Sequence, residues 1–487
     1  MDIQRVSDLL QEIAILEHQI ASWRGEDLPP DAGYSAHVIL DTLGYPPDVV
    51  HRTVSGPQGS QAHLIYLDLA IADELILEGV LTPLLQAKTP QDWTPQQFLL
   101  GAVVQAKTLD AVIRGILQGQ IAVGCSLWPS WVTVDVAHPP ERSISEPKNQ
   151  EVVHGPHNGF IENLWINLIQ IRQAIRSPFL RFEALQIGEL QSTTVVIASL
   201  AGVTPQALVR LIRQRLHRIR LAGFVDSSAI ASAMGSHAWV PTVQYTERPD
   251  DVVAALLEGR VAVLVDRTPA VLLAPSVLMH FLTRSSDYYQ LASTASFVRI
   301  IRLVGVMIGM AFPGLYVALA TVNQSLIPLP ILFTFIHSRL SIPFPVLLET
   351  LIMLLTFDVV YEAGLQMPGA LGQTISIVGA VVVGQAAIMA GIVSAPTVIV
   401  VAISFLSQFL IPEVDWASAI RLVRYPLVVM SGIFGLIGMT LSIVALLAAG
   451  TTLTSFGMPY LAPLGPLRSW AWRDGILRRP PKLRKHA

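Results

Sequence analysis

The sequence is poor in cysteine and in charge, and each shortage excludes a class of protein. Cys125 is the single cysteine among 487 residues, which excludes an intramolecular disulfide and a cysteine-based zinc site. It lies in an apolar run, which predicts a small buried core residue. Only 14% of the residues are charged, whereas soluble globular chains carry about 25%. The net charge of −3 gives no field that attracts nucleic acid, so we expect no nucleic-acid partner.

Sequence motifs of common enzymes are also missing. There is no GxSxG nucleophile turn, no Walker A loop, no HExxH zinc motif and no glycine-rich loop between a strand and a helix. We therefore expect no enzymatic activity, no cofactor and no metal. His154 and His157 flank a Gly-Pro turn, but no carboxylate or cysteine stands at ligand spacing, which favours a structural loop. The N-terminus has no basic stretch followed by an apolar one, so we expect no cleavable signal peptide and a cytoplasmic first domain.

The charged residues that are present gather in the first part of the chain. Residues 1–290 hold most of them, whereas 303–450 are nearly continuous apolar sequence. This distribution predicts a two-lobed α/β soluble N-terminal domain followed by an α-helical polytopic membrane domain. The predicted parts are an amphipathic N-terminal helix, a first α/β lobe, a linker with a second α/β lobe, a transmembrane domain and a basic cytoplasmic tail: 1–32, 33–150, 151–285, 297–450 and 451–487.

A repeated pattern predicts the two lobes. Residues 62–67 and 194–198 each read as a buried strand that leads into a helix. Residues 112–123 then resemble 252–263: in both, a helix stops at a glycine, Gly119 or Gly259, and a strand follows. We favour a duplication over a chance recurrence of this common pattern.

The second half contains five candidate membrane spans. They are the apolar segments 303–322, 345–360, 375–392, 397–411 and 426–449. Segment 326–335 is short, carries two prolines and suits a re-entrant or interfacial position better. Arginines precede the first span (Arg284, Arg299, Arg302) and a basic tail follows the last, so both flanks should be cytoplasmic. That orientation requires an even number of crossings, and the sequence leaves four to six open.

Small residues mark the faces on which these helices are expected to pack. Gly305 and Gly309 have GxxxG spacing, and Gly384, Gly432 and Gly435 lie in later spans. Such glycines let helices approach closely in lipid. The contacts could form within one chain or between the chains of an oligomer, and both interpretations stay open.

Polar side chains inside the apolar half are the candidate functional residues. A carboxylate at membrane depth costs roughly 2.5–3.5 kcal/mol, so it persists where it faces a pore, a cavity or a partner. The candidates for pore lining or gating are Glu349, Asp358, Glu362 and Gln385. Asp358 and Glu362 share a helix face, while Glu349 lies about opposite and is predicted to be the deepest. The alternative for each is an interhelical hydrogen bond or an interfacial position.

Several ordered motifs resemble the A subunit of spore nutrient germinant receptors, the GerA family. They lie in both halves of the chain, at 155–160, 258–266, 313–319, 343–345, 362–364, 372–380, 384–387, 394–396, 420–426 and 455–463. The chain departs from the family pattern where charge is expected: Leu354, Tyr361, Gln366 and Asn323 replace charged or ionisable residues of typical members.

The resemblance implies a multi-pass protein of the spore inner membrane that acts with two partners. These are a transporter-like B subunit, thought to bind the nutrient, and a lipoprotein C subunit. The A subunit would contact membrane lipid, form a homo-oligomer and act as a nutrient-gated ion channel or signal transducer that releases monovalent cations. Two other interpretations compete: a secondary transporter, although no inverted repeat is visible in 297–449, and a spore membrane scaffold or transporter-like protein of the same family without nutrient sensing.

Overall fold

The computed structural model contains two compact units, which are described separately. Unit 1 comprises Met1–Ser236 and Val243–Pro275, and unit 2 comprises His237–Thr242 and Ser276–Ala487. The predicted N-terminal helix, most of the linker before 156 and most of the basic tail lie outside the described residues. The side chains of 285 and 370–376 are not described either. The structure describes residues 27–29, 31–56, 59–68, 76–87, 89, 92–95, 98, 102–135, 156–189, 192–220, 226–235, 240–367, 370–462, 464–465 and 477–478.

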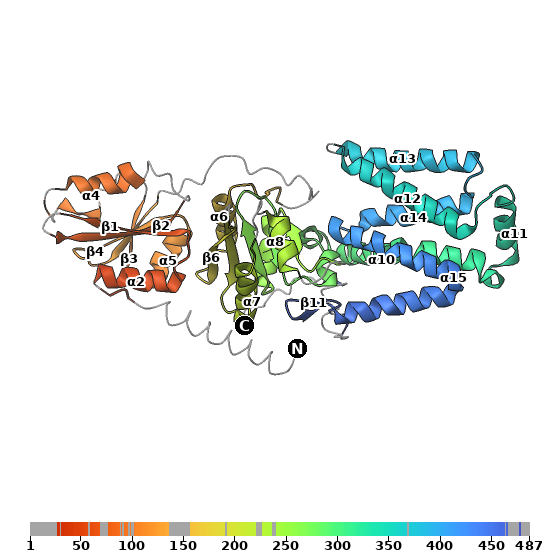
Figure 1. Ribbon diagram of the computed structural model, residues 1–487. Coiled ribbons are helices and arrows are strands. Elements are labelled where there is room, and N and C mark those ends of the chain that lie inside the picture. The colour runs from red at the N-terminus through yellow and green to blue at the C-terminus, as the bar shows by residue number, and fades with distance from the viewer. Residues whose placement is uncertain are drawn as a thin grey trace. The chain divides into compact units, whose positions relative to one another are not determined.

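The first lobe of unit 1 is a five-stranded antiparallel sheet covered by helices (Figure 1). Its strands pair in the order β1-β2-β4-β5-β3. The interior strand β2 is buried along nearly its whole length, and Cys125 is buried at the end of β4, the central strand, as predicted. The elements are α2 (Ala32–Leu43), β1 (Val49–Ser55), β2 (Gln61–Leu67), a π-helical turn (Leu77–Leu81), α4 (Thr82–Gln86), β3 (Val103–Ala106), α5 (Leu109–Leu117), β4 (Ile121–Cys125) and β5 (Trp131–Val134).

The second lobe repeats this arrangement. Its sheet is again antiparallel, with the order β6-β7-β9-β10-β8. Helix α9 packs its apolar face onto the sheet through Val252, Ala255 and Leu256, all of which are buried. The elements are α6 (Leu164–Ala174), β6 (Leu180–Ile187), β7 (Thr193–Leu200), α7 (Gln206–His217), α8 (Ser227–Met234), β8 (Gln244–Thr246), α9 (Pro249–Leu257), β9 (Val261–Val265) and β10 (Val271–Ala274).

The two lobes therefore share one topology, which agrees with the predicted duplication. In each sheet, the first, second, fourth, fifth and third strands of the lobe lie side by side. The glycine after the helix has a positive φ in both, 88° at Gly119 and 83° at Gly259. A Cβ on Gly259 would lie 2.8 Å from the Val203 carbonyl oxygen. The helix–glycine–strand pattern thus marks a tight turn that any other residue would strain.

A buried ion pair joins the two lobes. Arg172 of α6 donates two hydrogen bonds of 2.9 Å to the carboxylate of Asp48, and a third of 3.1 Å to the Leu180 carbonyl. The guanidinium also lies 4.7 Å from the ring centroid of Phe182. Both charged side chains are at most 6% exposed, so the pair is held in a desolvated contact with excellent geometry.

Unit 2 is helical, apart from a short hairpin of β11 (Thr454–Ser455) and β12 (Met458–Pro459). Each predicted apolar segment contains a helix, although α10 and α15 begin well before the segments predicted for them. Among the described residues, only α10 and α15 are both long and apolar enough to cross a membrane. The helices are α10 (Ala292–Thr321), α11 (Leu329–Ser338), α12 (Val346–Leu365), α13 (Ala370–Met389), α14 (Ala395–Ser407) and α15 (Val414–Thr452).

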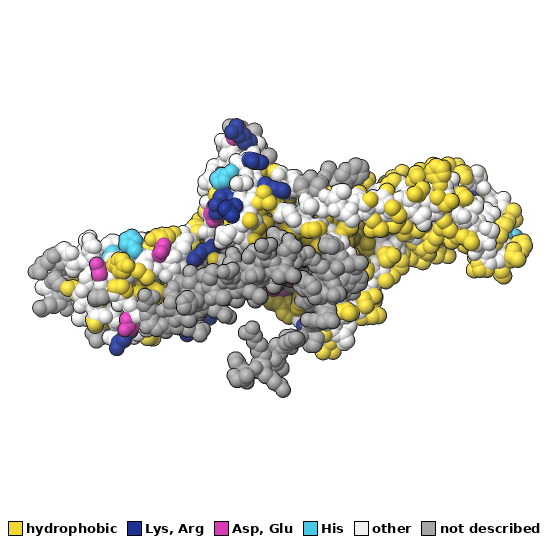
Figure 2. All heavy atoms as spheres, turned by 90° about the horizontal axis from the view of Figure 1, so that it is seen from below, with side chains coloured by type: hydrophobic (Ala, Val, Ile, Leu, Met, Phe, Trp, Pro, Cys, Tyr) yellow, Lys and Arg dark blue, Asp and Glu magenta, His cyan; other side chains and the backbone are white. Residues whose placement is uncertain are grey.

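The outer surface of unit 2 is strongly apolar. Figure 2 shows hydrophobic side chains spread over its helices. Leu355 is 59% exposed, Val444 62% and Ile437 69%, although these are large aliphatic side chains. Exposed apolar area of this extent is unusual on a monomeric water-soluble protein.

Helix α15 is interrupted at Gly435. This residue has φ 61° and ψ −143°, a conformation outside the helical region. The Asn323 side chain accepts a 2.9 Å hydrogen bond from the backbone N–H of Leu436 just after the break. A Cβ on Gly435 would lie only 2.2 Å from that Asn323 oxygen, so glycine is required by both the backbone and the contact.

Candidate functional site

Glu349 is a fully buried carboxylate of unit 2. It is 0% exposed, and its Oε1 accepts hydrogen bonds from the Ser394 backbone N–H and from Ser394 Oγ, the latter at 2.6 Å. Ser394 is the residue that begins α14. The carboxylate therefore lies at the positive end of the α14 dipole, where backbone N–H groups have no partner within the helix.

A chain of hydroxyl groups continues from this carboxylate. Ser394 Oγ lies 2.9 Å from Thr397 Oγ1, which lies 2.9 Å from the Tyr316 hydroxyl. All these side chains are nearly or fully buried. One connected set of hydrogen bonds thus links α12, α14 and α10.

The second oxygen of Glu349 faces an arginine across a short gap. Arg339 Nη2 lies 3.6 Å from Glu349 Oε2 and donates a 3.0 Å hydrogen bond to the Phe344 carbonyl. Glu349 Oε2 and Arg339 Nη1 are both buried without a hydrogen-bond partner among the described residues. The attraction here is electrostatic and lacks the direct hydrogen bonds that stabilise a buried pair.

Asp358 forms a second, better-paired cluster. Its carboxylate accepts bonds of 3.0 and 3.1 Å from Arg424 and one of 2.6 Å from the Tyr425 hydroxyl. The Arg424 side chain is 1% exposed. Arg424 Nη1 also reaches Ser404 Oγ at 3.4 Å, and that hydroxyl donates to the Gly309 carbonyl at 2.7 Å. The cluster ties α12, α15, α14 and α10 together.

The polar residues of α14 form one buried stripe. Ser394, Thr397, Ser404 and Gln408 follow the three- and four-residue spacing of a single helix face. Gln408 is only 5% exposed, and neither its side-chain nitrogen nor its side-chain oxygen has a hydrogen-bond partner among the described residues. This stripe runs between the Glu349 and Asp358 clusters.

A third cluster lies at the start of α10. The fully buried Asp287 accepts hydrogen bonds from Arg299 at 3.0 Å and from Arg302 at 2.8 and 2.9 Å. Both arginines were predicted to be a basic flank of the first span. The structure pairs them with a carboxylate that the sequence reasoning had not connected to them.

The four predicted polar candidates do not converge on one site. Glu349 and Asp358 are turned into the helical unit, whereas Glu362 and Gln385 are exposed on its outer surface. The relative depth of Glu349 and Asp358 in a membrane stays a prediction. Helix α12 extends to Leu365, so Glu349 belongs to its first turn and Asp358 lies nearer the middle.

The predicted packing glycines contact helices of the same chain. A Cβ on Gly305 would meet Leu410 at 2.5 Å, and one on Gly432 would meet Leu347 at 2.8 Å. Gly384 faces Val398 at 3.0 Å, and Gly309 faces Ser404 and Ser407 of α14 at 3.6 Å. Gly435 differs, because it breaks α15. These close approaches favour packing within one chain for the first four.

Sequence reasoning missed the partners of the carboxylates. Arg424 and Tyr425 were noted only within a family motif, because the last span was expected to begin after them. Ser394 precedes a proline at 396, a recognisable sign of a helix start, and could have been identified as a cap. Arg339 and Tyr316 had no such signal. Among the described residues, no three His, Cys, Asp or Glu side chains form a group that could hold a metal ion.

Comparisons with known proteins point to a single family. The family model for the Bacillus/Clostridium GerA spore germination protein matches residues 37–486. Spore germination protein KA of Bacillus subtilis is 33% identical over 448 residues, covering 90% of this chain and 82% of that protein. Spore germination protein A1 of the same organism is 34% identical and covers 77% of this chain and 78% of its own length.

Two further similarities are to a relative of uncharacterized function and to a solved structure. The uncharacterized membrane protein YfkQ of Bacillus subtilis is 32% identical, covering 89% of this chain and 86% of its own. A crystal structure of the N-terminal domain of the A subunit of the Bacillus megaterium spore germinant receptor GerK3 matches with a TM-score of 0.41 and 23% identity, over 52% of this chain and 98% of that one.

Proposed function

This chain belongs to the GerA family of spore germination proteins, and from that premise we propose that it acts as the A subunit of a spore germinant receptor. Unit 1 would lie in the cytoplasm, and unit 2 would cross the spore inner membrane several times. A transporter-like, nutrient-binding B subunit and a lipoprotein C subunit would complete the receptor. The N-terminal unit and the basic tail would lie on the same, cytoplasmic side.

The reversed polarity of unit 2 supports the membrane assignment. Large aliphatic side chains cover its outside, while Glu349, Asp358 and Arg424 lie inside it. In water, the opposite arrangement, with charged side chains outside and aliphatic side chains inside, would be more stable. Within a bilayer, a charged side chain costs several kcal/mol unless a partner or a cavity receives it, so enclosure in the protein is favoured.

Exposed polar groups on α12 and α13 support assembly into an oligomer. Glu362 and Gln385 lie on the outer surface of the same unit whose other polar side chains are enclosed. If these helices cross the membrane, lipid cannot solvate a carboxylate there. A second copy of the chain, or an aqueous path between copies, would remove that cost. We assign Glu362 and Gln385 to such a path for monovalent cations.

The enclosed clusters then suit gating rather than conduction. Glu349 and Asp358 each connect three or more helices through a few directed bonds. A change in one helix would alter the others, because the shared bonds cannot all survive a shift. The single observation that carries the proposed function is this set of buried charges inside an apolar-surfaced helical unit.

Nutrient-triggered potassium release from spores tests the proposal. Spores carrying Glu349→Ala should release little potassium or release it with a changed ion preference, with immunoblots showing normal amounts of the protein. Glu183→Gln, in a half-exposed ion pair of unit 1, is the matched control and should release potassium normally. Unchanged release from Glu349→Ala would remove the gating role of that residue.

A scaffold without nutrient sensing is the second candidate function. The uncharacterized membrane protein YfkQ matches about as much of this chain as the germination proteins do, so similarity alone does not select the receptor. Deletion of this gene alone distinguishes the two functions. Loss of germination in response to a nutrient supports the receptor, whereas unchanged germination with every nutrient supports the scaffold.

A further inference from the structure

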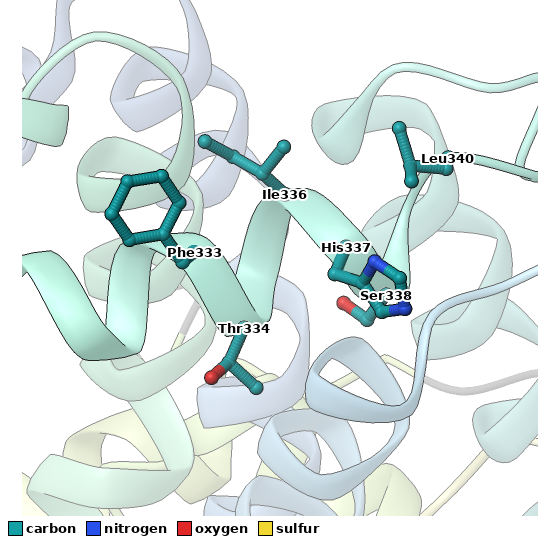
Figure 3. Close-up of a pocket in the computed structure, with 6 residues that line it drawn as sticks. All are labelled: Phe333, Thr334, Ile336, His337, Ser338 and Leu340. Atoms are coloured by element: carbon teal, nitrogen blue, oxygen red, sulfur yellow. The ribbon is translucent and has the colours of Figure 1, made fainter.

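Helix α11 is weakly held by the rest of unit 2. None of its residues is buried, and prolines stand at its start. Figure 1 shows it at the edge of the helical unit, and Figure 3 shows the labelled side chains spread along it and just beyond it. Those residues line a shallow, largely open depression, which gives the helix little apolar contact to hold it. Its position therefore depends on a few specific contacts.

Two contacts anchor this helix and its C-terminal end. The Phe335 ring meets the Tyr316 ring edge-to-face, with centroids 5.9 Å apart. Arg339, the residue that ends α11, lies 3.6 Å from Glu349. These contacts are at the two ends of the same hydrogen-bonded chain, which runs from Tyr316 through Thr397 and Ser394 to Glu349. One set of bonds thus controls both anchors.

The electrostatic anchor depends on a single charge. Among the described residues, Glu349 is the only carboxylate paired with Arg339, and the hydrogen bond of that guanidinium goes to the neutral carbonyl of Phe344. Glu349 Oε2 has no hydrogen bond to lose, so a proton from water can add to it without breaking any bond of the protein. The pair would then carry a net charge of +1 in a poorly solvated place. Movement of the Arg339 guanidinium into water would lower the free energy, because water solvates the unpaired charge.

We propose that Glu349 is a proton-binding site that latches α11 through Arg339, and that protonation of Glu349 releases the helix. This deepens the proposed function, since it rests on a gating role for Glu349 and names its ligand and the element it moves. The two hydrogen bonds that Ser394 donates to Glu349 Oε1 can persist in either protonation state of Glu349, because the oxygen of a neutral carboxyl group is still an acceptor. The proton therefore changes the Arg339 side of the site and leaves the α14 side intact.

Other ionisable groups near this site are few and separable. On α11, His337 is an exposed ionisable side chain. Tyr316 on α10 is part of the hydroxyl chain. Asp358 and Arg424 pair with each other further along α12 and α15, and Glu362 lies on the outer surface. A test must distinguish Glu349 from His337 first of all.

The test measures the mobility of a spin label on α11 in the full chain. Cys125→Ser removes the single native thiol, and Thr334→Cys, at an exposed position, carries the nitroxide. In lipid vesicles, the ratio of mobile to immobile label should rise about threefold or more as the pH falls from about 8 to about 4.5. In Glu349→Gln the ratio should be high at every pH, because the neutral amide imitates the protonated acid.

Two control variants complete the design. His337→Gln should keep the full pH response, and Glu183→Gln, which neutralises a half-exposed carboxylate of unit 1, should keep it too. A label that stays equally immobile at all pH values, or a response that disappears in His337→Gln, overturns the proton site. An immobile label in Glu349→Gln overturns the latch. Because the readout is independent of potassium release, failure of the proposed function leaves this result interpretable.

Discussion

Both units bury an apolar core, but they differ in how many large apolar side chains remain on the surface. In unit 1, Val263 and the other central strand residues are fully buried, and most charge lies outside. In unit 2, Ile437 is 69% exposed while Arg424 is buried. Burial of apolar surface stabilises a fold only when the surroundings are water. This difference favours different surroundings for the two units, and we propose that lipid surrounds the second.

One buried ion pair of each unit shows a second contrast. Arg172 donates two hydrogen bonds of 2.9 Å to the Asp48 carboxylate, and the arginine also contacts a carbonyl and an aromatic ring. Glu349 and Arg339 are 3.6 Å apart and each keeps an unpartnered atom. The first pair has the geometry of a fixed joint. The second has the geometry of a contact that one proton can disrupt.

The largest effect is expected from breaking the best-paired cluster of unit 2. Arg424→Leu leaves the Asp358 carboxylate without its partner in a poorly solvated place. Loss of one member of a buried pair costs roughly 3–5 kcal/mol of unfolding free energy. Thermal unfolding of the purified protein in detergent should show a large drop in midpoint.

The double variant Asp358→Leu/Arg424→Leu is the control for this prediction. Removing both charges should recover most of the lost stability, because no unpaired ion remains. If Arg424→Leu unfolds like the unaltered protein, the cluster is solvated and the contrast between the units fails at this point.

A smaller effect is expected from the joint between the lobes. Asp48→Asn removes the charge that satisfies Arg172 and should cost about 3 kcal/mol. Glu183→Gln removes a half-exposed partner of Arg213 and should cost about 0–1 kcal/mol. Hydrogen exchange of α6 and β1 measures both. Equal protection in the two variants would show that burial does not separate these pairs.

The smallest effect concerns two histidines in the first lobe. His51 Nε2 lies 3.1 Å from His63 Nδ1, and their rings are stacked with centroids 5.3 Å apart. Burial lowers the pKa of both residues, and the charges of His63 and His37 lower the pKa of His51 further, while Asp31 opposes the shift of His63. The folded lobe thus prefers neutral rings.

This preference predicts a defined pH dependence. The pair stabilises the lobe fully above the unfolded-state pKa of about 6.5, and the contribution is lost as the pH falls from there through the lowered folded-state pKa. Exchange protection of β1 and β2 should fall over that range, and the fall should shrink in His51→Asn. A pH-independent protection would mean that the two rings titrate as in the unfolded chain.

Local patterns in the sequence predicted elements well where one residue determines the geometry. Gly119 and Gly259 marked the matching turns of the two sheets, and the apolar segments marked the helices of unit 2. Pairings between distant residues were not predictable. Arg424 is 66 residues from Asp358, and no periodicity connects them. The end of α12 was not predictable either, because apolar sequence does not fix where a helix stops.

The central claim is that lipid, rather than water, surrounds unit 2. Spin labels at Leu355→Cys and Ile437→Cys, in the Cys125→Ser background and in lipid vesicles, test it through collisions with oxygen and with a water-soluble nickel complex. Tyr34→Cys on α2, where the tyrosine is 61% exposed, is the water-facing reference. We expect high oxygen and low nickel accessibility at both positions of unit 2 and the reverse at the reference. High nickel accessibility at Leu355 and Ile437 would contradict it.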